Sequence, residues 1–113
     1  MIELSEKERP AVAAITGAIK SFMDTGAAPV LLPIFFLVAR YPSRTCAELA
    51  KLREISLSTM SRHLLVLGHG SLALIQTQAE PRDARYIRHS LTEKGLALLK
   101  RMTWPFLRAA CPN

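Results

Sequence analysis

The chain has 113 residues, a length that suits one domain with a core large enough to fold without disulfides. Half of its residues are hydrophobic and 21% are charged, which excludes an intrinsically disordered chain. The net charge of +6 and the isoelectric point near 9.9 favour a nucleic-acid-binding protein, although many basic proteins bind no nucleic acid.

The two cysteines, Cys46 and Cys111, are too far apart for a disulfide framework or a zinc-ligand spacing. The first residues carry acids where a secretory signal would carry bases. The most apolar run, residues 27–39, is too short to span a bilayer and contains two prolines. We therefore expect a protein of a reducing cytoplasm, with no membrane partner, metal or cofactor.

The first predicted helix covers residues 10–24. Pro10 suits its first position, where a missing N–H costs nothing, and Gly26 suits its end. One face carries apolar residues at helical spacing: Val12, Ile15, Ile19, Phe22 and Met23. A second helix begins near Pro33 and ends at Tyr41-Pro42. Because it is apolar nearly all round, we expect it to be the central core helix.

Residues 45–67 are predicted to form a helix-turn-helix. Thr45 and Glu48 have the spacing of a capping box, and Ser56 can cap the helix that follows. The inward residues of the two helices are expected to be Cys46, Leu49 and Leu52, then Leu57, Met60, Leu64 and Leu67. The opposite face of the second helix carries Ser58, Thr59, Ser61 and Arg62, whereas His63 falls on the flank of the buried side and is interpreted as a packing residue.

A β-hairpin is predicted over residues 72–91, with strands at 72–78 and 85–91 and a turn between them. Thr92 can then cap a final helix over residues 92–107. The apolar face of this helix is expected to contain Leu96, Leu99, Thr103 and Phe106, and Trp104-Pro105 should kink or end it.

With its elements in this order, the chain resembles the MarR family of bacterial winged-helix regulators over roughly residues 28–101. The strongest match is Asp83-x-Arg85 followed by Leu91-Thr92-Glu93-Lys94-Gly95, which has the family's wing signature in residue type and spacing. Ala47-Glu48-Leu49-Ala50 and residues 58–64 resemble its helix-turn-helix. One departure is the turn Leu52-Arg53-Glu54-Ile55, where the family usually has a glycine.

The resemblance implies one winged helix-turn-helix domain over residues 1–113, mainly α with a small β-hairpin (α+β). It also implies that the N- and C-terminal helices, residues 10–24 and 92–107, build a homodimer. A small-molecule effector at the junction of these helices with the winged helix is a further implication, although apolar residues at helical spacing more often belong to a core.

The candidate DNA contacts follow from this resemblance and from side-chain chemistry. Arginine and hydroxyl groups can contact base edges and phosphates, so the exposed helix face is the candidate for the major groove. Arg85 resembles the wing arginine that reaches the minor groove, and Asp83 would organise the wing around it. The remaining candidates, as phosphate contacts, are Arg82, Arg88, Arg44 and Lys51.

The histidines and Cys46 form no ligand set, and no catalytic arrangement of residues is recognisable, so the protein is not expected to be an enzyme. The favoured function is a sequence-specific regulator of transcription that binds double-stranded DNA as a homodimer, most simply a repressor that occludes a promoter. Two alternatives stay open: a winged-helix module for protein interactions, and a non-specific architectural or plasmid or phage maintenance protein.

Overall fold

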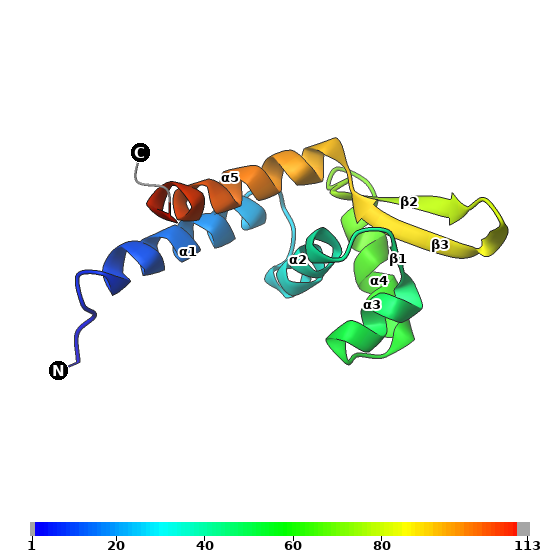
Figure 1. Ribbon diagram of the computed structural model, residues 1–113, viewed down its shortest axis with the longest axis horizontal. Coiled ribbons are helices and arrows are strands. Elements are labelled where there is room, and N and C mark those ends of the chain that lie inside the picture. Colours follow the sequence, from blue (N-terminus) through cyan, green and yellow to red (C-terminus); the bar gives the residue numbers. More distant parts are fainter. Residues whose placement is uncertain (1, 111–113) are drawn as a thin grey trace.

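A computed structural model describes residues 2–110, without the side chains of Ala84 and of residues 108–110. Two long helices, α1 (Glu8–Met23) and α5 (Glu93–Ala110), lie side by side and form an arm. The other elements form a body at one end of this arm, from which a β-hairpin projects (Figure 1). The predicted α+β winged-helix class is therefore confirmed.

Helix α1 begins two residues before the expected start at Pro10. Ser5 and Glu8 exchange hydrogen bonds: the Glu8 N–H donates to Ser5 Oγ at 3.2 Å, and the Ser5 N–H donates to Glu8 Oε1 at 3.3 Å. These contacts satisfy backbone groups ahead of the proline, which is tolerated within the first turn. Of the predicted apolar face of this helix, only Phe22 is buried.

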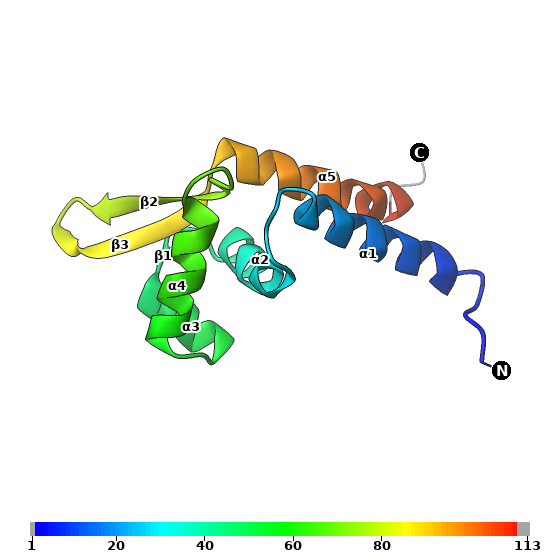
Figure 2. The same cartoon turned by 180° about the vertical axis from the view of Figure 1, so that it is seen from behind.

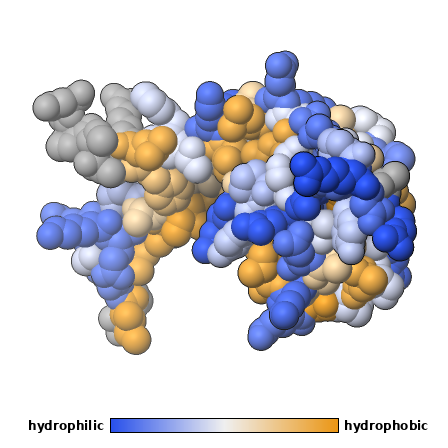
Figure 3. All heavy atoms as spheres, turned by 45° about the vertical axis from the view of Figure 1, so that its right-hand side comes forward, coloured by the Kyte–Doolittle hydropathy of each residue, from blue (hydrophilic) through white to orange (hydrophobic). Residues whose placement is uncertain are grey.

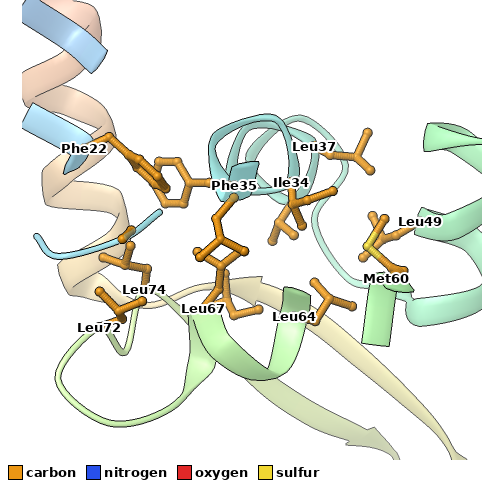
Figure 4. Close-up of a cluster of buried hydrophobic side chains, with 14 of the residues drawn as sticks. Phe22, Ile34, Phe35, Leu37, Leu49, Met60, Leu64, Leu67, Leu72 and Leu74 are labelled. Atoms are coloured by element: carbon orange, nitrogen blue, oxygen red, sulfur yellow. The ribbon is translucent and has the colours of Figure 1, made fainter. Parts of the chain in front are cut away.

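The central helix is α2 (Leu32–Arg40), which follows a short 3-10 turn, η1 (Pro29–Leu31). Ile34, Phe35, Leu37 and Val38 are buried on it, as its apolar composition predicted. The rings of Phe22 and Phe35 lie 5.4 Å apart, so α1 is joined to this core by an aromatic contact. Figure 4 shows the side chains of α2 between those of the arm and those of the body.

The helix-turn-helix consists of α3 (Cys46–Arg53) and α4 (Leu57–Gly68). Both predicted caps are confirmed, since Thr45 and Glu48 form a capping box and Ser56 Oγ accepts from the Thr59 N–H. Two predicted core residues are wrong: Leu52 is 49% exposed and Leu57 is 57% exposed. Both lie at the helix ends that flank the turn, where the helices extend beyond the core they share.

A three-stranded antiparallel sheet contains β2 (Ile75–Glu80), β3 (Asp83–Leu91) and the two-residue β1 (Arg44–Thr45), in the order β1-β3-β2. The predicted strand over residues 72–78 begins too early, because Ala73 has a positive φ of 43° and breaks the extended chain. Leu72 and Leu74 are buried before the strand starts. The expected six-residue turn is also wrong: only residues 81 and 82 separate the strands.

Helix α5 is capped by Thr92, whose Oγ1 accepts from the Gly95 N–H at 3.0 Å, as predicted. Its buried face is formed by Leu98 and Met102, however, while Leu96 and Phe106 of the predicted face are 43% and 39% exposed. The helix does not end at Trp104-Pro105 but runs on to Ala110 with the proline inside it.

Candidate nucleic-acid interface

The exposed face of α4 is built on a buried one. Met60, Leu64 and Leu67 are at most 4% exposed and anchor the helix in the core. On the other side Ser58, Ser61 and Arg62 are exposed, as the helical period requires. Seen from behind, this helix lies beside the base of the hairpin (Figure 2).

The hydroxyl of Thr59 has a different environment from its three neighbours. Thr59 is half-buried, and its Oγ1 accepts a hydrogen bond of 2.8 Å from Ser56 Oγ within the helix cap. Thr59 therefore supports the start of α4. Ser58 Oγ lies 3.3 Å from Ser56 Oγ in the same cap, whereas Ser61 and Arg62 are exposed further along the helix. His63 is half-buried on the flank of this helix.

The turn between α3 and α4 is made without glycine. Glu54 adopts the left-handed conformation, with φ 61° and ψ 44°, and its N–H donates to Lys51 O at 3.3 Å. The next residue, Ile55, donates its N–H to Ala50 O at 3.1 Å. The chain thus forms the tight turn of a helix-turn-helix at the cost of backbone strain at one glutamate.

At the wing tip, Asp83 holds Arg85 by its backbone and by its side chain. Asp83 Oδ1 accepts from the Arg85 N–H at 3.0 Å, and Oδ2 accepts from Nη2 at 2.8 Å. The hydrogen bonds from Arg85 lower the pKa of the Asp83 carboxyl below its usual value. The arginine side chain is nevertheless 87% exposed, so its outer face is open to a ligand.

The other predicted cations differ in how far hydrogen bonds and salt bridges within the protein already occupy them. Arg82, in the hairpin turn, and Lys51, on α3, are exposed. Arg44 Nη1 lies 3.5 Å from Glu48 Oε2 in an exposed pair that is expected to be weak. Arg88 is occupied more fully, because its guanidinium donates to Glu80 and to the carbonyl of Ser43.

A groove of about 900 Å³ lies between the helix-turn-helix and the wing, and both Ser61 and Arg85 line it. One candidate on α4, Ser61, and the wing arginine therefore face a common space, whereas Ser58 and Arg62 do not line it. The groove is not at the junction with the arm, where the sequence suggests an effector. Its floor includes His89, which is 9% exposed and whose Nδ1 has no hydrogen-bond partner among the described residues. Burial lowers the pKa of this imidazole, which favours its neutral form.

Sequence reasoning treated His89 as an isolated residue and left Glu80 and Ser43 unassigned. Strand alternation could have placed His89, because it shares a face of β3 with Ile87 and Leu91. No sequence signal indicates the contacts of Ser43, which come from a strand 45 residues further along the chain.

Cys46 has the environment of an unreactive thiol. Cys46 is half-buried, its thiol lies 3.8 Å from Leu57 O, and burial raises its pKa, so it remains a thiol at neutral pH. Cys111 lies outside the described residues. Within residues 2–110, no three metal-binding side chains gather at one place, and no helix has both the length and the apolar character needed to cross a membrane.

Comparison with known proteins gives likeness in structure but not in sequence. No protein-family model matches the chain, and no curated protein matches it. Among solved structures, a MarR family transcription regulator is 22% identical, with a TM-score of 0.67, and the match covers 90% of this chain and 67% of that one. The transcriptional regulator Tm0710 from Thermotoga maritima is 17% identical over 91% of this chain and 73% of its own, with a TM-score of 0.71.

A third similar structure is that of a mutant MarR from E. coli complexed with operator DNA. It is 16% identical, with a TM-score of 0.66, and the match covers 90% of this chain and 71% of that chain. The first two of these structures are those of regulators of transcription. The chain, with a capped helix-turn-helix and a hairpin that runs into α5, therefore has a MarR-like winged-helix fold.

Proposed function

We propose that this protein is a transcription regulator that binds a specific double-stranded DNA sequence as a homodimer, and that it acts as a repressor. The observation that carries the proposal is that both DNA-facing elements carry an exposed arginine: Arg62 on α4 and Arg85 at the wing tip. The wing and α4 project from the same end of the molecule, away from the free end of the arm (Figures 1 and 2). One duplex can thus receive α4 in its major groove and the wing in the adjacent minor groove.

A second copy of the chain is the proposed partner of the arm. On α1, Val12, Ile15, Ile19 and Met23 are 38–49% exposed, and Trp104 and Leu107 on α5 are 61% and 57% exposed. Figure 3 shows hydrophobic surface along this part of the molecule. The radius of gyration is 16.2 Å, whereas a compact domain of this length has one of about 13 Å. An elongated arm with an apolar side is the shape expected of half a dimer.

Two-fold symmetry determines the form of the DNA site. A dimer presents two copies of α4, so the proposed operator is a pseudo-palindrome with half-sites about one helical turn apart. Occupation of such a site within a promoter is enough for repression, and no catalytic group is needed. The protein would act in the cytoplasm, associated with the nucleoid when bound. An effector at the junction of the arm and the body would act by changing the distance between the two copies of α4.

The two alternatives lack a corresponding observation. A protein-docking module has no need for exposed arginines on both the helix and the wing. A non-specific DNA-binding protein would need the positive charge but not the short hydroxyl side chains of Ser58 and Ser61 beside Arg62. The ratio of specific to random-site affinity distinguishes these possibilities.

The test is selection of bound sequences from a random duplex pool by the wild-type chain and by the variants Arg62→Ala and Arg85→Ala. The wild-type chain should enrich a pseudo-palindrome, and Arg62→Ala should lose definition at the bases that α4 contacts. Lys7→Ala is a matched control, since it removes one positive charge from an exposed site just before α1, at the free end of the arm. No enrichment over random DNA by the wild-type chain would overturn the proposal.

A further inference from the structure

Arg88 on β3 joins three separate parts of the winged helix. Its Nε donates to Glu80 Oε2 at 2.9 Å, at the end of the neighbouring strand β2. Its Nη1 donates to the carbonyl oxygen of Ser43 at 2.9 Å, just before β1. The same Nη1 lies 3.8 Å from Glu48 Oε1, in the first turn of α3. Only the forked guanidinium of an arginine can make contacts in these directions at once.

Ser43 is held by β3 from both sides. It has a positive φ of 60°, an unfavourable conformation for a residue with a side chain. Its N–H donates to the carbonyl oxygen of His89 at 2.9 Å, while its own carbonyl accepts from Arg88. Consecutive residues of the wing strand therefore hold the strained residue that leads into the helix-turn-helix.

The contacts of Arg88 lie at the last position, toward the wing tip, where the wing is still attached to the rest of the sheet. Strand β1 pairs with β3 only at two positions, Arg44 with His89 and Thr45 with Arg88. In the described part of the chain, β3 beyond Arg88 pairs only with β2 on its way to the tip. The direction in which the tip points is thus determined close to Arg88, and the exposed Arg85 lies only three residues away.

We propose that Arg88 is a positioning residue that fixes the wing against the helix-turn-helix, so that Arg85 and Arg62 meet one duplex together. The proposal rests on the proposed function and replaces the expectation that Arg88 contacts phosphate. Its partners Glu80 and Glu48 are acids, which are unsuitable neighbours for a phosphate-binding group but suitable ones for a structural clamp.

The variant Glu80→Gln separates the two roles by the sign of its effect on DNA affinity. If Arg88 bound phosphate, loss of the competing acid would free the guanidinium and raise the affinity. If Arg88 positions the wing, Glu80→Gln loosens the clamp and lowers the affinity by roughly three- to tenfold, although the protein has lost a negative charge. A rise in affinity overturns the proposal.

Replacements of Arg88 test the same point through salt dependence. Arg88→Met should weaken binding with little change in the slope of log affinity against log salt, whereas loss of a phosphate contact lowers the slope by about 0.9. Arg88→Lys should have nearly the same low DNA affinity as Arg88→Met, because lysine keeps the positive charge but lacks the forked guanidinium. Restoration of the wild-type affinity by lysine, or a slope reduced by one contact in Arg88→Met, contradicts the positioning role.

A double-mutant cycle with Arg85→Ala shows whether Arg88 acts through the wing tip. Removal of Arg85 should cost less affinity in the Arg88→Met background than in the wild type, because the tip is already misplaced. Purely additive losses would mean that Arg88 affects stability alone and would sink the proposal.

Hydrogen exchange in the free protein tests the clamp without DNA. The amide of Ser43 should exchange about tenfold faster in Arg88→Met and in Glu80→Gln, while the Leu74 amide, bonded to Leu67 O, should keep its protection. Unchanged exchange at Ser43 would overturn the clamp. If the wild-type chain bound no DNA, the proposed function would fail, and this measurement would still decide whether the clamp exists.

Discussion

A Cβ atom placed on Gly95 would lie 2.1 Å from the carbonyl oxygen of Leu74. That same oxygen accepts a hydrogen bond of 3.1 Å from the Thr92 N–H. The start of α5 therefore packs directly on the backbone that leads into β2, and the glycine is required by this close approach. The junction connects the arm to the wing, and Thr92 Oγ1, which donates to Ala73 O at 2.7 Å, adds a second contact to it.

Gly95→Ala should lower the free energy of unfolding by about 2–3 kcal/mol or more, because backbone must move to admit the methyl group. Gly17→Ala is the matched control. Gly17 lies inside α1, and a Cβ atom placed on it would have nothing within 4 Å, so alanine there should stabilise the protein, by about 0.5–1 kcal/mol. Urea denaturation measures both. Equal stability of Gly95→Ala and the wild type would show that the contact can relax.

Glu54→Gly should raise the free energy of unfolding by about 0.5–1 kcal/mol, since glycine adopts the left-handed conformation without strain. The side chain is exposed, and no hydrogen bond from it contributes to the turn among the contacts of residues 2–110. Glu54→Ala removes the same charge but keeps the strain, so it should not stabilise. If alanine stabilised as much as glycine, charge rather than backbone conformation would be the cause.

Much of the fold follows from local sequence signals that act over a few residues. The caps at Thr45, Ser56 and Thr92 were predictable because each depends only on a side chain and the next turn of helix. The apolar run of α2 was sufficient to place it in the core. Such features need no knowledge of distant parts of the chain.

Other features depend on contacts that no local pattern encodes. Leu57 has the right spacing for the core but lies where the core ends. On α5 the predicted apolar face is only partly correct: Leu99 packs against the core, but Leu98 and Met102, from a neighbouring stripe, are the buried residues. Arg88 was indistinguishable from a phosphate-binding arginine until its distant partner Ser43 was known.

The buried imidazole of His89 should make folding stability depend on pH. Burial lowers its pKa below 6.5, so the unfolded chain binds a proton at a higher pH than the folded chain does. The free energy of unfolding should then fall as pH drops below 6.5, by up to about 1.4 kcal/mol per pH unit from this group, and should be unaffected by it above 6.5.

His89→Leu tests this dependence by removing the titrating group. Denaturation between pH 7 and pH 5 should show a shallower loss of stability in the variant than in the wild type. His69→Gln is the control, because it removes an exposed histidine in place of the buried one. Parallel pH profiles for His89→Leu and the wild type would mean that the folded protein accommodates the charged imidazole.

The apolar side of α1 yields the prediction on assembly. Ile15 is 49% exposed, so lysine there should leave the folded protomer intact but place a charge within a dimer interface, where it is unpaired and costly. Sedimentation equilibrium should show a monomer for Ile15→Lys at concentrations at which the wild type is a dimer.

Ala13→Lys provides the matched control for this experiment. Ala13 is also exposed on α1, but a separation of two residues places it on nearly the opposite side of the helix from Ile15. The Ala13→Lys variant should remain dimeric although it carries the same added charge as Ile15→Lys. DNA binding should change accordingly: Ile15→Lys should lose affinity for a pseudo-palindrome by about a hundredfold, because the second half-site no longer benefits from the first. A dimer that survived Ile15→Lys would show that this side of the arm does not face the second copy.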